Sequence, residues 1–497
     1  MNLNEILCGI DSEIISGSKM KEIEGISLDS RKVDQNYMFV AIKGERTDGH
    51  NHIQDAVIRG ARTVVCESLP NIKDERTTYI KVTDTSLALA RIAANFYDNP
   101  SDYLYLAGIT GTNGKTTLTY LLESLWKKQG KITGLIGTIE NRYAGVTDNS
   151  IMTTPDSIEL TMLLDKMRRS GVDNVTMEVS SHAIDRKRVY GCNFDTAVFT
   201  NITQDHLDYH KTFDNYFKTK KKFFTELLEH STKKKKTAVI NIDDRYGRVI
   251  ASEISSDIIT YSTENNKAEV FSSEIELLQN GIQALVHTPY GNIKLRSSLV
   301  GRHNLYNLLA AVSVCISQDF DLGSLEEFLS ERTIIPGRLE RIQNNAGMNV
   351  LVDYAHTPDA LENVLSTLRA ITKGRLIVVF GCGGDRDRGK RPKMGKIAYQ
   401  MSDLAIITSD NPRTENPEDI IKDIIQGIDK TLEREYLAVE NREQAIEKAI
   451  GIAKKEDVVL IAGKGHEDYQ IIGTNKIHFD DREIAKQYLI ERERSEV

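Results

Sequence analysis

Short apolar runs alternate along most of the chain with longer stretches in which apolar residues recur every three or four positions. The short runs are typical of buried strands, and the longer stretches are typical of amphipathic helices. The predicted strands span residues 37–42, 63–66, 103–107, 174–179, 196–200, 237–242, 349–353, 375–381, 404–408 and 457–462. The predicted helices span residues 86–97, 118–126, 157–169, 213–228, 358–371, 391–402, 417–428 and 443–455. Strands and helices in regular alternation indicate an α/β fold built on parallel sheets.

Two breaks divide this alternation. An Asn-Pro pair at 99–100 and a Pro-Gly pair at 336–337 are typical of turns between domains, and 497 residues are too many for one hydrophobic core. We therefore predict three domains, residues 1–99, 100–334 and 335–497. The central domain should contain a parallel sheet with a small antiparallel excursion, because residues 265–300 alternate with period two around a turn at 289–292. The third domain is predicted to be doubly wound and Rossmann-like.

Composition narrows the classes of function. Apolar residues make up 40% of the chain and charged residues 27%, and the formal net charge of -8 disfavours a nucleic-acid surface. The five cysteines are scattered without CxxC spacing, which favours neither a disulfide framework nor a zinc site. No apolar stretch reaches the length needed to cross a bilayer. We therefore expect a cytoplasmic monomer that binds small molecules, with no nucleic acid and no membrane span.

The most informative segment is a glycine-rich turn at residues 108–117, which reads GITGTNGKTT. It follows a predicted strand and opens a predicted helix. The glycines let backbone N–H groups turn inward, the helix N-terminus adds partial positive charge, and Lys115 adds a full one. A loop whose backbone N–H groups point inward in this way, next to positive charge, forms an anion-binding concavity that is suited to phosphate. The spacing departs from the standard P-loop pattern, which would place a glycine where Ile109 stands.

Polar residues that follow two of the predicted strands are candidate ligands for a metal ion. Glu178 ends the strand 174–179, and His206 lies in the polar segment after the strand 196–200. Open α/β sheets bind their ligands at the carboxyl ends of strands. A bound nucleoside triphosphate needs magnesium, which takes oxygen ligands from such residues. Taken alone, Glu178 is better interpreted as a solvated carboxylate at a strand end, and His206 as a hydrogen-bonded loop histidine.

Taken together, these segments resemble the Mur ligases, the ATP-dependent amide-forming enzymes of peptidoglycan precursor synthesis. The matching motifs run in order through the whole chain, at residues 111–117, 178, 206, 301–307, 336–338 and 353–356. The resemblance implies ATP as co-substrate, Mg²⁺ as cofactor, and an N-terminal UDP-binding, a central ATP-binding and a C-terminal amino-acid-binding domain. It implies ATP contacts from Gly111, Thr112, Asn113, Gly114, Lys115, Thr116, Thr117, Asn304, Asn307, Arg338 and Asp353. It implies catalytic roles for Lys115, Glu178, His206, Lys220 and Arg338.

Within the family, the chain is similar to the branch that extends UDP-N-acetylmuramoyl-L-alanyl-D-glutamate by one amino acid. The resemblance implies that this nucleotide dipeptide is held by Leu28, Ser30, Thr153, Thr154, Ser180, Arg186 and Arg188. Arg186 departs from the pattern, because relatives usually carry glutamine there. A cation at this position still suits a phosphate or a carboxylate.

Lys220 aligns with a lysine that is carbamylated in relatives, where the modification turns an ammonium into a carboxylate that helps to hold magnesium. The implied metal ligands are Thr116, Glu178, His206 and carbamylated Lys220. The alternative is a surface role, since a helix over residues 213–228 would show several of its lysines to water in any fold.

The segment from Asp410 to Arg413 discriminates between amino-acid substrates. In the resembled enzymes an arginine at the last position goes with meso-2,6-diaminopimelate, and a non-basic residue goes with L-lysine. Diaminopimelate carries an additional distal carboxylate, which Arg413 can grip through two parallel charge-assisted hydrogen bonds. The implied contacts are Arg386, Asp410, Asn411, Pro412, Arg413, Gly463 and Glu467. A second phosphate-binding turn is the alternative for residues 463–465.

The hypothesis from the sequence is an ATP-dependent ligase that adds meso-2,6-diaminopimelate through an acyl phosphate. The alternatives are the same ligase using L-lysine, a ligase like folylpolyglutamate synthetase, and a nucleotide-switched binding protein that ligates nothing. The proton of the incoming amine has three candidate acceptors: His206, His182 and the substrate phosphate.

Overall fold

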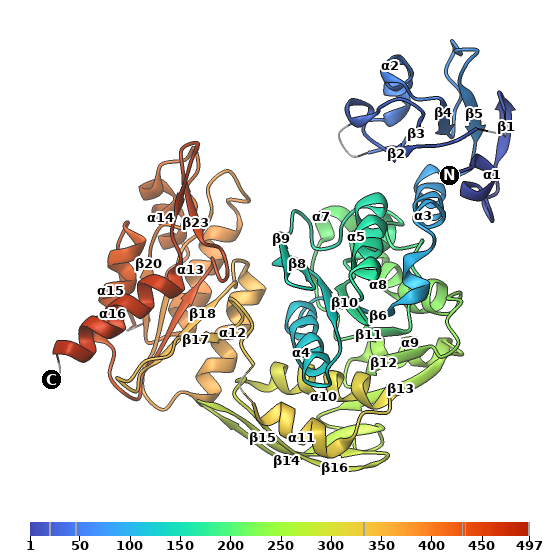
Figure 1. The fold of residues 1–497 in the computed structure, drawn as a ribbon. Helices are drawn as coiled ribbons and strands as arrows, with labels where there is room; N and C mark the ends of the chain where they lie inside the picture. The colour runs from blue at the N-terminus through green and yellow to red at the C-terminus, as the bar shows by residue number, and fades with distance from the viewer. Residues whose placement is uncertain (19–20, 45–46, 332, 430, 433, 496–497) are drawn as a thin grey trace. The chain divides into compact units, whose positions relative to one another are not determined.

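The computed structural model describes residues 1–18, 21–44, 47–331, 333–429, 431–432 and 434–495. The chain forms two compact units. The first unit consists of Met1–Ser272, Val286–Asn292 and Tyr306–Phe328, and the second consists of Ser273–Leu285, Ile293–Leu305 and Leu329–Val497. Both units are α/β, which confirms the predicted fold class (Figure 1).

The first unit begins with a five-stranded sheet in the order β1-β5-β4-β3-β2. Its strands are β1 (Glu13–Ser16), β2 (Gly25–Ser27), β3 (Tyr37–Val40), β4 (Thr63–Cys66) and β5 (Thr78–Lys81). Its helices are α1 (Leu3–Ile6), α2 (Ile53–Arg59) and α3 (Thr85–Phe96), with short 3₁₀ turns at Ser30–Lys32, Gly49–His52 and Pro100–Tyr103. All neighbouring strands are parallel except β1, which pairs antiparallel with β5.

An eleven-stranded sheet follows, in the order β16-β15-β14-β13-β12-β11-β6-β10-β7-β8-β9. Its middle strands are β6 (Tyr105–Thr110), β7 (Thr133–Ile136), β10 (Asn174–Glu178), β11 (Thr196–Phe199), β12 (Thr237–Asn241) and β13 (Asp257–Ser262), and they are parallel to one another. Its flanking strands are β8 (Glu140–Tyr143), β9 (Val146–Asn149), β14 (Val270–Leu278), β15 (Gly281–Thr288) and β16 (Gly291–Ser297). The register pairs Ile109 with Glu178 and Thr110 with Phe199, so three neighbouring strands end side by side.

The helices linked to this sheet are α4 (Lys115–Lys128), α5 (Ser157–Arg169), α6 (Ser181–Asp185), α7 (Leu207–His210), α8 (Phe213–Lys222), α9 (Arg245–Glu253), α10 (Arg302–Ser317) and α11 (Leu322–Ser330). Three of them, α4, α5 and α8, correspond to predicted helices, and the others were not predicted. The helix predicted over residues 213–228 is α-helical only to Lys222 and continues as a π-helix over Phe223–Leu228.

The predicted antiparallel excursion over residues 265–300 corresponds to β14, β15 and β16. These strands extend the central sheet, because β14 pairs in parallel with β13. The connections between β14, β15 and β16 are too short for parallel crossovers, so these strands run antiparallel. A second antiparallel pair, β8 and β9, extends the opposite edge and was not predicted.

The second unit carries a six-stranded sheet in the order β17-β18-β22-β19-β20-β21. Its strands are β17 (Glu340–Arg341), β18 (Asn349–Asp353), β19 (Leu376–Phe380), β20 (Leu404–Ile407), β21 (Glu435–Ala438) and β22 (Val458–Ala462), and a separate hairpin pairs β23 (Tyr469–Ile472) with β24 (Asn475–His478). The helices are α12 (Pro358–Ile371), α13 (Lys390–Met401), α14 (Pro417–Ile425), α15 (Arg442–Ile452) and α16 (Asp481–Ser495). Every pairing in the sheet is parallel except that of β17.

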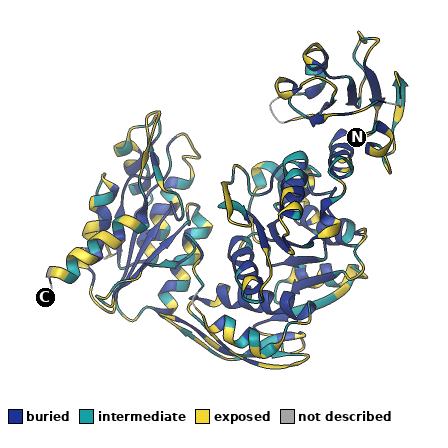
Figure 2. Ribbon diagram, viewed as in Figure 1, coloured by how far each residue is buried: buried dark blue, intermediate teal, exposed yellow. Residues whose placement is uncertain are grey.

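Alternation along the strands of this sheet fills two separate cores. Leu351 and Val378 pack with α12, α13 and α14 on one face, whereas Val350 and Val379 pack with α15 and α16 on the other. The buried strands therefore lie between two layers of helices whose outer faces are exposed (Figure 2). Such a two-sided arrangement is the doubly wound domain that the sequence predicts.

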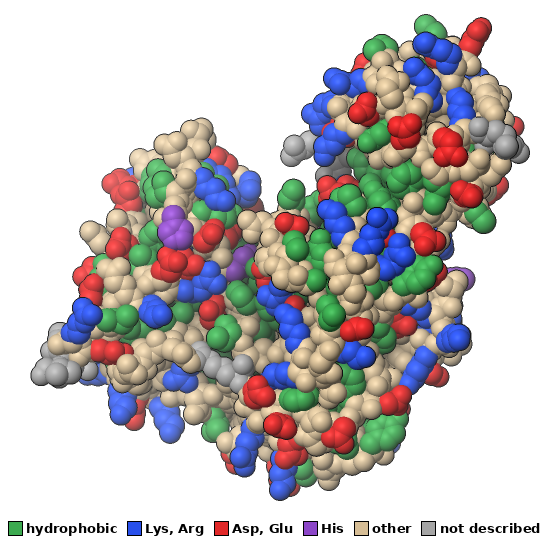
Figure 3. Space-filling model, viewed as in Figure 1, with side chains coloured by type: hydrophobic (Ala, Val, Ile, Leu, Met, Phe, Trp, Pro, Cys, Tyr) green, Lys and Arg blue, Asp and Glu red, His purple; other side chains and the backbone are tan. Residues whose placement is uncertain are grey.

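The surface carries both signs of charge. On the face drawn in Figure 3, blue and red side chains are interspersed over both units. Across the part of the chain that the structure describes, no helix is both long and apolar enough to cross a membrane.

A buried ion pair ties the last helix to the sheet of the second unit. Arg442 donates from Nε and Nη2 to the two carboxylate oxygens of Asp481, both at 2.7 Å, and both side chains are fully buried. The same guanidinium donates to the carbonyls of Ser409, two residues after β20, and of Ala462, the last residue of β22. The pair thus joins α15 and α16 to two strand ends.

We predict that Arg442→Met lowers the free energy of unfolding by about 3–5 kcal/mol, because it leaves the Asp481 carboxylate buried without its partner. Urea unfolding followed by circular dichroism measures this; the only tryptophan, Trp126, belongs to the first unit. Lys422→Met is the control, since Lys422 forms only exposed ion pairs, and it should change stability by less than about 0.5 kcal/mol. A loss below about 1 kcal/mol for Arg442→Met would contradict the prediction.

Candidate active site

The glycine-rich loop connects β6 to α4 and can exist only with glycine at two of its positions. Gly111 and Gly114 have φ angles of 152° and 88°, which side chains rarely adopt. A Cβ atom at Gly111 would lie 1.9 Å from Thr200 Oγ1, and one at Gly114 would lie 2.4 Å from Asn307 Oδ1. The loop is therefore packed against the end of β11 on one side and against α10 on the other.

Lys115 is folded back over this loop. Its Nζ donates to the carbonyl oxygens of Gly111 at 3.0 Å and Thr112 at 2.9 Å. The loop is also held in place by Asn201, whose Oδ1 accepts from the backbone N–H of Asn113 at 3.0 Å. The lysine, the loop and the start of α4 thus form one cationic feature, suited to bind phosphate oxygens.

Glu178 is the buried acid at the centre of the site, with a relative exposure of 1%. Its Oε1 accepts from Thr116 Oγ1 at 2.9 Å and from the backbone N–H of Thr138 at 2.8 Å, while its Oε2 accepts from Thr138 Oγ1 at 3.1 Å. The structure therefore brings Thr116 and Glu178 together as predicted. Thr138 was missed, because β7, the strand that it follows, was not predicted and the pairing of β7 with β10 is visible only in the fold.

Lys220 is buried in the same site and does not face water. Its exposure is 1%, and its Nζ donates to the carbonyl of Gly111 at 2.8 Å and lies 4.8 Å from the centre of the Tyr216 ring. Two lysines, Lys115 and Lys220, therefore share one carbonyl acceptor. Burial, together with the positive charge of Lys115, lowers the pKa of Lys220 well below its ordinary value.

Three histidines and two tyrosines form a cluster of rings beside these residues. His182 lies 5.0 Å from His206 and 5.7 Å from His210 between ring centres, and Tyr209 and Tyr216 complete the cluster. His206 has a left-handed backbone with φ of 53°. Burial lowers the pKa of His206, and burial with the nearby His206 lowers the pKa of His182 to about 4. Both rings are thus neutral at neutral pH and can accept a proton or ligate a metal.

The donor set suits magnesium in part. Among the described residues, no group of three or more His, Cys, Asp and Glu side chains is arranged to hold a metal ion. The hydroxyl of Thr116 and the carboxylate of Glu178 lie together and offer the oxygen ligands that magnesium prefers. An unmodified Lys220 ammonium would repel the ion, so this residue fits a metal only after it has lost its positive charge.

The candidate contacts for the nucleotide dipeptide fall into two groups. Thr154 Oγ1 donates to the backbone carbonyl of Glu178 at 2.8 Å, and Arg188 donates to the carbonyl of Thr154 at 3.0 Å. Thr153 and Ser180 belong to the same group. Thr138 Oγ1 donates to Thr153 Oγ1 at 3.1 Å, and Thr154 Oγ1 donates to Ser180 Oγ at 3.3 Å. Leu28 and Ser30 follow β2, in a different sheet.

Arg186 has a partner of its own in the ring cluster. Its Nε donates to Tyr209 OH at 3.3 Å, and its guanidinium lies 5.4 Å from the centre of that ring. Tyr209 OH in turn donates to Asp185 at 2.6 Å. The residue that departs from the family pattern is therefore tied to the tyrosine beside His182.

Of the two predicted ATP contacts on α10, Asn307 lies against the loop, at Gly114. Asn304 lies one turn earlier on α10 and donates to the carbonyl of Val300 at 2.9 Å. Arg338 and Asp353 belong to the second unit, where Asp353 accepts from the N–H groups of Leu339 at 2.7 Å and Ala355 at 2.9 Å. Burial raises the pKa of Asp353, against the opposing effect of Arg338.

The predicted amino-acid contacts gather at the carboxyl ends of β19, β20 and β22. Asn411 Nδ2 donates to Glu467 Oε2 at 3.0 Å, and Asn411 Oδ1 accepts from Lys464 Nζ at 3.3 Å. Burial raises the pKa of Glu467, and Lys464, which is fully buried, opposes this. Gly463 donates to the carbonyl of Asp353 at 3.0 Å. Lys464 was not among the predicted amino-acid contacts, and a second phosphate-binding turn was the alternative for residues 463–465.

Arg413 is held by its backbone in an uncommon conformation. Its φ is 51°, its N–H donates to the carbonyl of Ile471 at 3.0 Å, and its carbonyl accepts from Gly473 at 2.7 Å. The β23–β24 hairpin thus fixes the residue on both sides. The Arg413 guanidinium donates to the carbonyl of Gly384 at 2.8 Å, and the exposed Arg386 follows two residues after that glycine.

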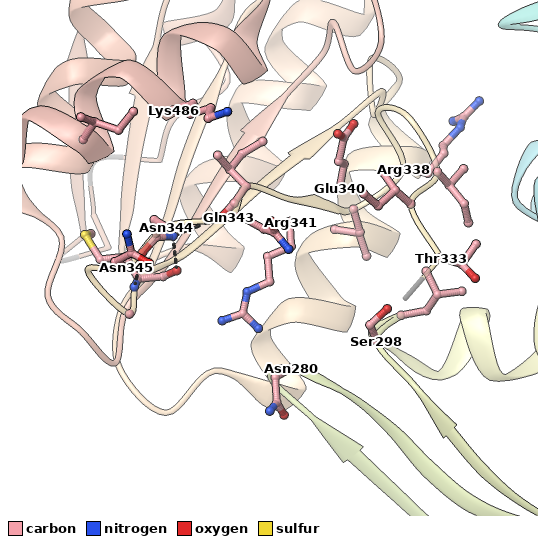
Figure 4. A pocket seen from close by; sticks show the side chains of 18 of the residues that line it. Asn280, Ser298, Thr333, Arg338, Glu340, Arg341, Gln343, Asn344, Asn345 and Lys486 are labelled. Carbon is pink, nitrogen blue, oxygen red and sulfur yellow. Dashed lines mark hydrogen bonds between the residues drawn. The ribbon is translucent and has the colours of Figure 1, made fainter. Parts of the chain in front are cut away.

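A cavity of about 630 Å³ lies in the second unit, apart from this cluster. Asn344 and Asn345 lie at one end and Ser298 and Thr333 at the other (Figure 4). Among the described residues that line it, Arg338 is the one predicted to act in the site. The cavity therefore carries none of the predicted phosphate or amino-acid contacts apart from that arginine.

Three family descriptions match successive parts of the chain. They are "Mur ligase family, catalytic domain" over residues 22–97, "Mur ligase middle domain" over residues 109–315, and "Mur ligase, glutamate ligase domain" over residues 337–465. Together they cover both the glycine-rich loop and the cluster around Asn411.

Known relatives match the chain over nearly its full length. The UDP-N-acetylmuramoyl-L-alanyl-D-glutamate–2,6-diaminopimelate ligase 1 of Clostridium acetobutylicum is 45% identical, over 99% of this chain and 100% of its own. A solved structure of a ligase with the same substrates in its name is 32% identical, with a TM-score of 0.74 over 99% of each chain. The MurF ligase of Thermotoga maritima, solved in complex with ADP, shares the fold at 20% identity, with a TM-score of 0.61 over 94% of this chain and 98% of its own.

We predict that Gly111→Ala weakens ATP binding at least tenfold, because the new methyl group collides with Thr200 and strains the loop. Isothermal titration calorimetry with ATP measures the effect. Gly130→Ala is a matched control, since Gly130 also has a positive φ of 75° but has nothing within 4 Å of its added Cβ. Equal ATP affinity for the Gly111→Ala variant and the unaltered protein would contradict this assignment of the loop.

Proposed function

Because the chain belongs to the Mur ligase family, we propose that it joins meso-2,6-diaminopimelate to UDP-N-acetylmuramoyl-L-alanyl-D-glutamate and converts ATP to ADP and phosphate. The observation that carries the choice of amino acid is Arg413, fixed beside the Asn411–Glu467 pair. One guanidinium and one carboxylate in a single cluster match the distal carboxylate and ammonium of diaminopimelate.

We assign the reaction to two displacements. An oxygen of the D-glutamyl γ-carboxylate attacks the γ-phosphorus of ATP, the bond to the bridging oxygen breaks, and ADP leaves with that electron pair. The amine of diaminopimelate then attacks the acyl carbon, and phosphate leaves as the amide bond forms. The amine proton passes to His206, to His182 or to the departing phosphate.

The first displacement brings a carboxylate to a triphosphate, so cationic groups are required. Two unit charges at 4 Å interact by about 4 kcal/mol at an effective dielectric constant of 20. Lys115 and the N–H groups at the start of α4 oppose this repulsion. A bound magnesium ion would supply further charge neutralisation, and we assign its ligands to Thr116, Glu178, His206 and a carbamylated Lys220.

Two features of Lys220 support its carbamylation. First, the amine of Lys220 is fully buried in a site that already contains the Lys115 ammonium, and the Nζ atoms of both lysines donate to the carbonyl of Gly111. Second, the lowered pKa of Lys220 leaves more of its amine uncharged near neutral pH, and only the uncharged amine adds to carbon dioxide. The product is a carbamate anion, which removes the repulsion between the two lysines.

Selectivity for diaminopimelate follows from the cost of leaving Arg413 without a carboxylate. Breaking a buried charge pair costs about 3–5 kcal/mol, and each 1.4 kcal/mol is tenfold, so L-lysine should be used at least a hundredfold less well. We assign the three substrates to three domains: the nucleotide sugar to residues 1–99, ATP to residues 100–334 and the amino acid to residues 335–497.

A coupled assay of ADP release tests the proposed function. The purified protein is given ATP, magnesium and the UDP-muramoyl dipeptide, with meso-2,6-diaminopimelate, L-lysine, L-ornithine or no amino acid. Sustained ADP release with diaminopimelate, with formation of the tripeptide product, supports the proposal. ADP release that is indifferent to both acceptors would overturn the ligase assignment, and a preference for L-lysine would overturn the choice of amino acid.

Arg413→Ala should raise the KM for diaminopimelate about a hundredfold and leave the KM for ATP within about twofold, because only the distal carboxylate loses its partner. Initial rates at varied concentrations of each substrate measure both constants. Arg413→Lys is the matched variant: it keeps the charge but lacks the fork of two parallel donors, so we expect an intermediate KM. A parallel rise of the KM for ATP would show that Arg413 is misassigned.

Lys220→Ala should lower kcat about tenfold or more, and short carboxylates such as formate or acetate should restore part of it, because they replace the carbamate oxygens. Lys218→Ala is the control, since Lys218 lies on the same helix but is exposed and pairs with Asp214. Carbon-13 NMR with labelled bicarbonate should show a carbamate signal in the unaltered protein that Lys220→Ala lacks. An unaffected rate in Lys220→Ala would exclude the modified lysine from the reaction.

A further inference from the structure

Two loops of the second unit each supply one predicted guanidinium for the amino acid. The loop after β19 carries Arg386, and the loop after β20 carries Arg413. The two loops touch directly, since the N–H of Gly384 donates to the carbonyl of Asn411 at 2.9 Å and Arg413 donates to the carbonyl of Gly384 at 2.8 Å. The spacing of the two guanidiniums therefore depends on how these loops are fixed to each other.

A buried arginine outside both loops connects them. Arg391, in the first turn of α13, is fully buried. It donates to both carboxylate oxygens of Glu415, at 2.8 and 3.0 Å, and its Nη2 lies 3.3 Å from the carbonyl of Gly383. Glu415 in turn accepts from the N–H of Asp385 at 2.6 Å. Arg391 and Glu415 together thus link one loop to the other through four side-chain atoms: Nη1 and Nη2 of Arg391 and the two carboxylate oxygens of Glu415.

The charges around Arg391 are matched. Asp423 on α14 accepts from Nη1 at 2.9 Å, so two carboxylates face this guanidinium. Hydrogen bonds from Arg391 and from the N–H of Asp385 lower the pKa of Glu415 to about 2. The exposed Arg388 also approaches, at 3.4 Å from Glu415 and 3.5 Å from Asp423. A bidentate pair whose arginine is fully buried holds its partners in one geometry.

We propose that Arg391 is a positioning residue for the amino-acid substrate. It acts through Glu415 to hold the loop with Arg386 against the loop with Arg413. This inference rests on the proposed function, because it concerns how the same amino-acid site is built. Two like-charged guanidiniums on facing loops repel each other before the substrate arrives, and a fixed scaffold keeps both near one carboxylate.

Arg391→Met tests the proposal in the full-length protein. We expect the KM for meso-2,6-diaminopimelate to rise about tenfold or more, while the KM for ATP and for the UDP-muramoyl dipeptide stay within about twofold. Glu415→Gln, which removes the charge and keeps the shape, should raise the same constant in the same direction. Arg391→Lys keeps the charge without the fork and should restore part of the loss.

Arg375→Met is the matched control. Arg375 also pairs with a carboxylate, donating to Asp457 at 2.8 and 3.0 Å, but it lies just before β19, at the opposite end of the same strands. General destabilisation of this unit would change both variants alike, so only Arg391→Met should raise the KM for diaminopimelate selectively. Urea unfolding of each variant shows whether it is folded under the assay conditions.

The outcomes separate this inference from the proposed function. If the unaltered protein forms no product with diaminopimelate, the proposed function fails. If it does, but Arg391→Met and Glu415→Gln leave the KM for diaminopimelate within about twofold, the positioning role is overturned. A parallel rise of the KM for ATP in Arg391→Met, or an equal effect of Arg375→Met, would overturn it as well.

Discussion

Parallel pairing of β6 with β10 and β11 is the constraint on which the candidate active site depends. Parallel strands end at one edge of a sheet, so the segments that follow them meet there whatever their separation along the chain. The glycine-rich loop, Glu178 and the segment that leads to His206 are brought together in this way. The six-stranded sheet repeats the arrangement, since the loops after β19, β20 and β22 carry Arg386, Arg413 and Glu467.

Burial of charge distinguishes the two sites. Around Gly111, two lysines converge on one carbonyl, and Glu178 is satisfied by hydroxyl and amide donors instead of by a cation. Around Asn411, charges of both signs lie together, and Lys464 pairs with Glu467. Burial acts to raise the pKa of Asp410, but Arg442, Lys464 and a hydrogen bond from the N–H of Asn411 together lower it. The first site is thus prepared for an anion, whereas the second is prepared for a molecule that carries both charges.

Many elements that bury an apolar run or stripe were predicted from the sequence, although the buried strand β7 and the amphipathic helix α9 were missed. Strand 349–353 and helices 157–169 and 358–371 match the structure residue for residue, because each buries one continuous run or stripe. β21 and the β23–β24 hairpin are largely exposed and have no such pattern. The site divides in the same way: motif residues such as Thr116 and Asn307 could be named, whereas Thr138 and Arg391 could not, because their roles come from contacts between strands or loops that only the fold brings together.

The left-handed backbone of Arg413 limits how the amino-acid preference of this protein can change in evolution. Its φ of 51° is fixed from both sides by the β23–β24 hairpin, so a replacement must accept that conformation before its side chain can select anything. Glycine, asparagine and aspartate adopt it at little cost, while valine, isoleucine and threonine do not. A substitution at position 413 must therefore first be compatible with the left-handed backbone, and only then can its side chain change which substrate is bound.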